Sequence, residues 1–279
     1  MKSLALVICV PSIALAHHGQ DFFVTLDSEV PAAYSAATFT SFEWSRNGSA
    51  YELSVEPGFL VGIAPGLAAG ASVSFEDDGG GNWNYSAIIP QLQFQFPVGD
   101  FPVSFGVSAS YSFADGAAEH DDGAAGHSHG GSGGRGSDID LGPDAPPSGS
   151  GGSQPHVHSH SGHPHSGIHR HGEDYFLLRL VAESSLGENT RLVGNLIGVA
   201  ADSGEIDLGY ALGIRRQINH DFAIGLEAIG DFNLHGEHEV IGGVYWSPSH
   251  AFVVRFGAGA GIGATASDFS LHGGVTWRF

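Results

Sequence analysis

The last eleven residues of the chain, 269–279, alternate between apolar and polar side chains. Side chains of a β-strand point to opposite faces with a period of two, so this stretch predicts a strand with one apolar and one polar face. The apolar positions are Phe269, Leu271, Gly273, Val275, Trp277 and Phe279, and the other positions are Ser270, His272, Gly274, Thr276 and Arg278. A strand of a soluble sandwich can show the same alternation, although such a chain would rarely end on a bare aromatic residue.

This ending resembles the closing strand of Gram-negative outer-membrane β-barrels, which finish on Phe with another aromatic residue two positions earlier, as Phe279 and Trp277 do. The resemblance implies a closed antiparallel transmembrane β-barrel with outer-membrane lipid against its outer face. It also implies that the barrel-assembly machinery recognises the C-terminal strand. The resemblance covers nearly the whole mature chain and includes transporter-like barrels with histidine-rich loops, but no motif in it defines a substrate.

Eleven further segments show strand patterns and, with the closing strand, predict an all-β barrel of about twelve strands. An even number is what single-chain bacterial barrels require. Asn47-Gly48 predicts a hairpin turn, and Pro57 predicts a bulge or a weakened rung because proline cannot donate to the ladder. The predicted strands before the last are 34–46, 51–63, 67–75, 83–96, 103–113, 174–184, 191–200, 206–216, 222–232, 239–246 and 252–262.

The amino terminus predicts export. Met1-Lys2, an apolar run and the small pair Ala14 and Ala16 indicate a signal peptide over 1–16, cut near Ala16. No later apolar run reaches the roughly 20 residues that a membrane helix needs. Residues 17–33 are predicted to be a periplasmic lead-in and 34–279 the outer-membrane barrel. The only cysteine, Cys9, lies in the signal peptide, so the mature chain can form neither disulfides nor thiol metal sites.

The charge balance is strongly acidic. Lys2 is the only lysine, so the mature chain would carry nine arginines against 30 acidic residues. Binding to nucleic acid requires a basic surface, so nucleic acid is not expected as a partner. Cations are the natural counterpart of such a chain. Acidic, glycine-rich surfaces are also ordinary for exported barrels.

Residues 114–173 interrupt the barrel pattern with glycine, serine, proline, aspartate and histidine. Such a stretch buries too little apolar surface to fold, so we expect a disordered loop, on the extracellular side if both chain ends are periplasmic. His-x-His pairs on a flexible backbone suit Zn(II), Cu(II) or Ni(II). A neutral low-complexity insertion and a pH-sensing tract are the alternatives. The candidate metal ligands are His120, His127, His129, His156, His158, His160, His163, His165, His169 and His171.

The alternation also predicts which charged side chains face the lumen. Acidic residues outnumber arginines among them, so an open pore would favour cations. A barrel of about twelve strands is narrow, and these groups could instead pair with one another and close it. The predicted lumen-lining residues are Glu43, Glu52, Glu56, Glu76, Arg179, Glu183, Asp207, Arg215, Glu227, Asp231, Glu239, Arg255 and Arg278.

No enzyme and no organic cofactor are expected. Ser270 and His272 face inward on one strand, but the sequence supplies neither a third partner of known position nor a nucleophile motif. The function that these patterns favour is a barrel that binds divalent transition metal at the cell surface and passes it inward. The alternative is a passive or structural barrel, or a narrow pore, whose histidine-rich loop is incidental or mediates surface contacts.

Overall fold

The structure is a computed structural model of the chain. It describes residues 21–48, 50–77, 83, 85–97, 102–115, 174–202, 204–232, 238–263 and 266–279. Within these ranges, no helix is long and apolar enough to cross a membrane. The predicted signal peptide and nearly all of the predicted histidine-rich loop, including its ten candidate metal ligands, lie outside the described residues.

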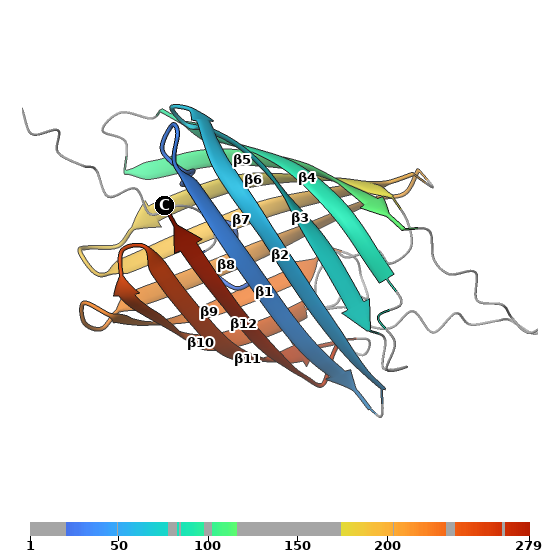
Figure 1. Ribbon diagram of the computed structural model, residues 1–279. Coiled ribbons are helices and arrows are strands. Elements are labelled where there is room, and N and C mark those ends of the chain that lie inside the picture. Colours follow the sequence, from blue (N-terminus) through green and yellow to red (C-terminus); the bar gives the residue numbers. More distant parts are fainter. Residues whose placement is uncertain are drawn as a thin grey trace, which may run out of the picture. The chain divides into compact units, whose positions relative to one another are not determined.

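Twelve antiparallel strands form one closed barrel (Figure 1). Each strand pairs with its neighbour in sequence, and the ring closes where β1 pairs with β12 from Ala37 opposite Arg278 to Arg46 opposite Phe269. The predicted all-β closed barrel and its strand number are confirmed. The strands are β1 Ala36–Asn47, β2 Ala50–Ala64, β3 Leu67–Asp77, β4 Tyr85–Phe96, β5 Val103–Ala114, β6 Tyr175–Ser185, β7 Thr190–Ala201, β8 Ile206–Gln217, β9 Phe222–Asp231, β10 His238–Ser249, β11 Phe252–Ile262 and β12 Phe269–Arg278.

Large apolar side chains cover the outer face of the barrel. On β12, Val275 and Trp277 are exposed while Ser270, Thr276 and Arg278 on the opposite face are buried. The same alternation holds on β8, where Leu208 and Leu212 point outward. A continuous apolar exterior with a polar interior is the sorting expected when lipid, not water, surrounds the wall.

Two local features of the wall follow from single residues. Asn47 pairs with Ala50 in the β1–β2 ladder, so the turn begins at Gly48, one residue later than predicted. Gly48 has a positive φ of 58°. The β2–β3 pairs on the two sides of Pro57 are in the same register, with Val55 opposite Phe75 and Gly58 opposite Ser72. No pair is described between them. Pro57 therefore weakens a rung and makes no bulge, because it lacks the N–H donor.

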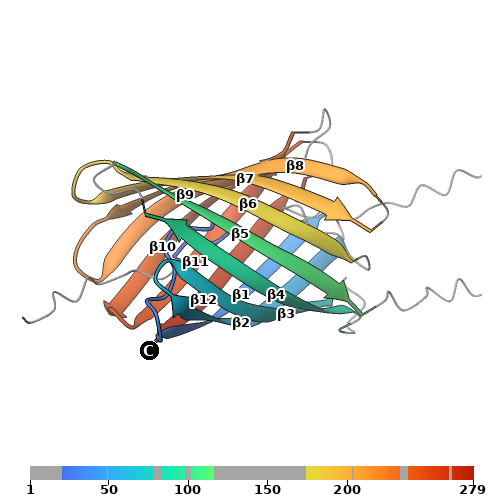
Figure 2. The ribbon, with the colours of Figure 1, turned by 90° about the horizontal axis from the view of Figure 1, so that it is seen from above.

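The segment before β1 lies within the barrel. Residues 17–33 were predicted to be a periplasmic lead-in, and the described part from Asp21 onward runs inside the wall, as the dark blue trace in Figure 2 shows. Phe22, Thr25, Asp27 and Ser28 are almost completely buried. A short segment with several acidic residues can be buried here because the inner wall supplies partners for its backbone and its charges.

Candidate functional site

A polar cavity of about 200 Å³ lies inside the barrel, between the N-terminal segment (residues 21–35) and the inner faces of β1–β6, β9 and β12. Four carboxylates point toward it, Glu43 from β1, Glu52 and Glu56 from β2, and Glu76 from β3. Arg179 on β6 is the one basic side chain other than a histidine among the described residues that line it. The cavity therefore carries an excess of negative charge.

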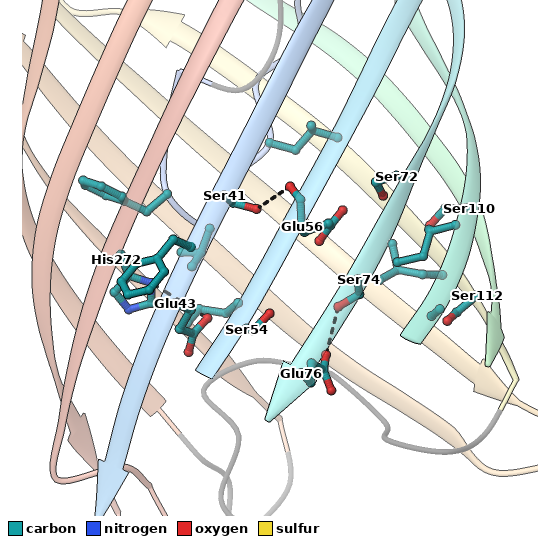
Figure 3. A pocket seen from close by; sticks show the side chains of 18 of the residues that line it. Ser41, Glu43, Ser54, Glu56, Ser72, Ser74, Glu76, Ser110, Ser112 and His272 are labelled. Carbon is teal, nitrogen blue, oxygen red and sulfur yellow. Dashed lines mark hydrogen bonds and ion pairs between the residues drawn. The ribbon is translucent and has the colours of Figure 1, made fainter. Parts of the chain in front are cut away.

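Serines occupy most of the remaining inward positions of this wall. Ser54, Ser72, Ser74, Ser108, Ser110 and Ser112 line the cavity with Gln91. Figure 3 shows the hydroxyl of Ser74 donating to Glu76 Oε1 at 3.0 Å and that of Ser41 donating to the Glu56 carbonyl at 3.4 Å. Small hydroxyl-bearing side chains leave space and offer both donors and acceptors to water or to a solute.

The opposite boundary of the cavity is the N-terminal segment, which is tied to the wall through its backbone. The N–H groups of Phe23, Val24 and Thr25 donate to the carboxylate of Glu227 on β9, at 2.7, 2.9 and 3.0 Å. The hydroxyl of Tyr245 on β10 donates to the same carboxylate at 2.7 Å. Glu227 is only 1% exposed, so four donors satisfy a buried carboxylate that would otherwise be costly.

Further along the segment, the wall replaces the hydrogen bonds that a neighbouring strand would give. The side-chain amide of Asn195 on β7 accepts from the Leu26 N–H at 2.7 Å and donates to the Leu26 carbonyl at 2.8 Å. Glu183 accepts from both the N–H and the hydroxyl of Ser28, at 3.1 and 3.0 Å. Gln93 donates to the carbonyls of Asp27 and Glu29.

An ionic cluster holds the start of the segment. The carboxylate of Asp21 accepts from Arg191 at 3.0 Å, lies 3.1 Å from Arg215, and makes a third ion pair with Arg278 of the closing strand. These three guanidinium groups come from β7, β8 and β12. Several paired charges in one buried network are worth more than isolated surface pairs because solvent screens them less.

Asp27 is a residue of the segment whose carboxyl group the wall satisfies poorly. Its side chain is fully buried, neither carboxylate oxygen has a hydrogen-bond partner among the described residues, and Arg191 lies 3.7 Å away. Burial raises the pKa of the Asp27 carboxyl to about 7, although Arg191 acts in the opposite direction. The protonated form of Asp27 is therefore better suited to this position than the charged form.

Wall glycines make the space that the segment occupies. Gly243 on β10 and Gly257 on β11 are cross-strand partners, and a Cβ at either would come within 2.3 and 2.9 Å, respectively, of the Phe23 ring. A Cβ at Gly213 would lie 2.9 Å from Phe22. These glycines therefore form a socket for aromatic side chains of the segment.

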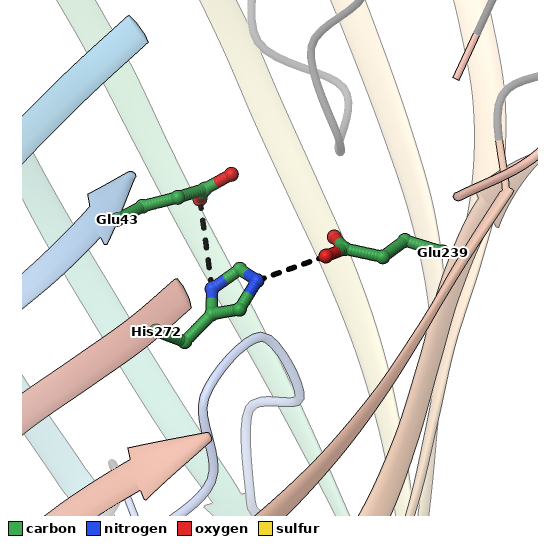
Figure 4. Close-up of side chains that lie close together, drawn as sticks. All are labelled: Glu43, Glu239 and His272. Carbon is green, nitrogen blue, oxygen red and sulfur yellow. Dashed lines mark hydrogen bonds and ion pairs between the residues drawn. The ribbon is translucent and has the colours of Figure 1, made fainter. Parts of the chain in front are cut away.

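A second cluster is formed by inward side chains of β1, β10 and β12. Figure 4 shows the His272 ring between two carboxylates, with Nε2 3.0 Å from Glu239 Oε1 and Nδ1 3.8 Å from Glu43 Oε2. The Ser270 hydroxyl donates to Glu239 Oε1 and lies 3.0 Å from His272 Nε2. Ser270 is fully buried and is not among the residues that line the cavity, so this geometry does not present it as a nucleophile.

The structure brings most of the predicted lumen residues into these two regions. Glu43, Glu52, Glu56, Glu76 and Arg179 line the cavity. The contacts above place Glu183, Arg215, Glu227 and Arg278 beside the N-terminal segment and Glu239 beside His272. Asp207, Asp231 and Arg255 occupy positions of β8, β9 and β11 that share the inward face with Arg215, Glu227 and Val253.

Three important inner-face residues were absent from the sequence-based set, namely Arg191, Asn195 and Tyr245. All three follow the inward register of their strands, and an asparagine in the middle of a membrane strand was a usable signal. The segment itself offered a weaker one, since Phe22 and Phe23 stand close to Asp21 and Asp27 in a stretch with no strand alternation.

The structure was compared with known proteins. No protein-family model matches the sequence, and no curated protein matches it either. Among solved structures, the KdgM porin superposes with a TM-score of 0.54 at 6% identity, over 87% of this chain and 99% of that one. An outer-membrane channel from Pseudomonas putida F1 gives 0.55 at 9% identity, over 91% and 98%. The NanC porin gives 0.50 at 8% identity, over 86% and 98%.

The chain has the fold of the small outer-membrane porins. At these identities the likeness extends to architecture, and the neighbours' solutes do not transfer with it. The acidic cavity and the internal N-terminal segment are therefore what bear on the function of this chain.

Proposed function

We propose that this protein is an outer-membrane channel for small cations, and that its histidine-rich segment concentrates divalent metal at the mouth. The observation that carries the channel proposal is the cavity, in which Glu43, Glu52, Glu56 and Glu76 face one arginine, Arg179, among the described lining residues. Rings of carboxylates favour cations in narrow pores because each charge is partly shielded from bulk water.

The solute found in the KdgM porin has the opposite charge to the one proposed for this chain. That protein has been solved in complex with disordered oligogalacturonate, which is a polyanion. Four carboxylates in a cavity of about 200 Å³ would repel such a solute. A cation or a small basic molecule is the better match to the charge of this lumen.

The N-terminal segment explains how such a channel would be kept shut. It crosses the lumen with contacts to β4, β6, β7, β8, β9 and β12. Passage of an ion from the cavity to the other end of the barrel then requires the segment to shift. The proposal therefore predicts low conductance for the native chain and higher conductance when the segment is loosened.

Recording in planar bilayers tests the channel. Under a salt gradient, we expect the reversal potential to have the sign that indicates cation selectivity. We expect this potential to move toward zero in the variant E52Q/E56Q/E76Q. Glu188→Gln is the matched control, because Glu188 is an exposed carboxylate in the β6–β7 turn. Anion selectivity would contradict the proposal, and so would an absence of conductance in both the native chain and a variant with a loosened segment.

The metal-gathering part rests on the His-x-His pairs of the sequence and has its own test. Replacing the ten histidines between positions 120 and 171 by glutamine keeps the length of the chain and removes the imidazoles. We expect the native protein to bind several zinc ions in equilibrium dialysis, and the substituted chain to lose most of them. Equal binding by the two proteins would favour the alternative, in which the barrel is a passive pore and the segment is incidental.

A further inference from the structure

We infer that Glu239, His272 and Ser270 bind one divalent metal ion inside the barrel, with Glu43 orienting the imidazole. This inference deepens the proposed function and rests on it only for the route by which the ion would arrive. The site is separate from the histidine-rich segment, because all four residues belong to the strands β1, β10 and β12.

The donor atoms form a compact triangle. His272 Nε2 lies 3.0 Å from Glu239 Oε1 and 3.0 Å from Ser270 Oγ, and the Ser270 hydroxyl contacts Glu239 Oε1 directly. Ligands bound about 2.0–2.2 Å from zinc in tetrahedral geometry stand roughly 3.3 Å from one another. A small opening of this triangle would therefore place an ion between the three atoms.

Glu43 occupies the position of a supporting residue. Its carboxylate lies 3.8 Å from His272 Nδ1, on the other side of the ring from Glu239. In metal sites a carboxylate on the second ring nitrogen fixes the tautomer and the direction of the imidazole. Glu43, Glu239 and His272 also have ligand atoms within 4.8 Å of one another, so Glu43 is close enough to become a ligand itself.

A glycine of the wall makes the space that the donor atoms occupy. A Cβ on Gly259 of β11 would come 2.1 Å from Glu239 Oε1 and 2.4 Å from Ser270 Oγ. Any residue other than glycine at position 259 would therefore push into the triangle. The cavity supplies access, because His272 and Glu43 both line it.

The charge of the cluster also suits a divalent cation. The charged groups that act on His272 are the carboxylates of Glu239, Glu43 and Glu227. Glu239 and His272 are 1% and 3% exposed, respectively. A divalent ion bound by neutral imidazole between Glu239 and Glu43 would balance both negative charges, whereas a protonated imidazole balances one. One imidazole with oxygen donors and no thiolate favours zinc over soft Cu(I).

The test uses the full-length chain in which the ten histidines between positions 120 and 171 are glutamine, so that zinc titration by calorimetry reports on the barrel. We expect one zinc ion per chain. Because replacing residues that only support a ligand costs about 10–100-fold in affinity, His272→Gln and Glu239→Gln should weaken binding by at least roughly 100-fold. His238→Gln is the control, since His238 stands on the outer face of β10 and pairs with Tyr210.

Anomalous scattering from zinc-soaked crystals of the same protein gives a second readout that does not depend on how well the variants fold. A peak within bonding distance of His272 Nε2 and Glu239 is expected. Absence of zinc binding by the loop-substituted chain, or binding that survives both substitutions, would overturn the site. Failure of the loop proposal is seen separately, as equal zinc binding by the native and loop-substituted chains.

Discussion

Replacement of Glu227 by glutamine should release the N-terminal segment from the barrel wall. The Glu227 carboxylate accepts three backbone N–H groups of the segment and the Tyr245 hydroxyl, two donors on each oxygen. In the Glu227→Gln variant, an NH₂ group replaces one of these oxygens and cannot accept. Whichever oxygen is replaced, two donors lose their acceptor inside a buried site.

The size of the effect follows from those two bonds. A hydrogen bond to a charged group contributes about 1.5–3 kcal/mol, so docking should weaken by roughly 3–6 kcal/mol. Each 1.4 kcal/mol corresponds to a tenfold change in an equilibrium constant. The undocked population should therefore rise by more than roughly 100-fold, even at the lower end of the range.

A cysteine reporter makes this population measurable. The mature chain is predicted to contain no cysteine, and Thr25 is buried with a hydroxyl that has no hydrogen-bond partner. Thr25→Cys should therefore be tolerated, and a maleimide should label it only when the segment leaves the wall. We expect the labelling rate in folded, membrane-inserted barrels to increase with Glu227→Gln in proportion to the undocked population.

Glu188→Gln in the same reporter background controls for the loss of one negative charge outside the lumen. Folding is checked by whether the barrel keeps its heat-dependent electrophoretic mobility. If a folded Glu227→Gln barrel labels no faster than this control, the carboxylate does not hold the segment, and the docking contacts inferred above are wrong.

Three further predictions use the same reporter. Gly243→Val should speed labelling because its side chain would enter the space of an aromatic ring, whereas Gly242→Val, which meets nothing within 4 Å, should not. Asn195→Ala should have a smaller effect than Glu227→Gln, about 1–3 kcal/mol, because it removes two neutral hydrogen bonds. The pKa of Asp27 is about 7 and that of Glu29 about 9 when the segment is docked, and both are near 4 in water, so docking is strongest below about pH 4 and weakens as the pH rises to about 9. Labelling normalised to the unfolded protein at each pH should rise over that range, and a flat profile would contradict the assignment of buried protons to these two carboxyls.

The barrel itself could be predicted because the direction of a strand side chain is a local property. Alternation over ten or so residues indicates which side chains meet lipid and which face inward, without knowledge of the partner strand. Arg215 and Glu227 could therefore be placed on the inner face from their own strands alone. The turn after Asn47 was displaced by one residue because a positive φ at Gly48 depends on the geometry of the hairpin as a whole.

The N-terminal segment could not be placed in this way. Its contacts over residues 21–29 join residues that are 64 to 257 positions apart in the chain, and its backbone there bonds to side chains and not to a strand ladder. Such a segment shows neither the hydrophobic period of a helix nor the alternation of a strand. The cluster at His272 has the same origin, since Glu43, Glu239 and Ser270 become neighbours only after β12 pairs with β1 and β11.

The ion pair between Asp21 and Arg278 joins the first described residue to the last strand. The seam of the barrel is the β1–β12 pairing, and Asp21 also contacts arginines of β7 and β8. If the barrel closed while the N-terminal segment was still outside, three guanidinium groups would lack this carboxylate. The segment would then have to thread into a closed barrel. Insertion of the N-terminal segment before the seam closes would avoid both penalties.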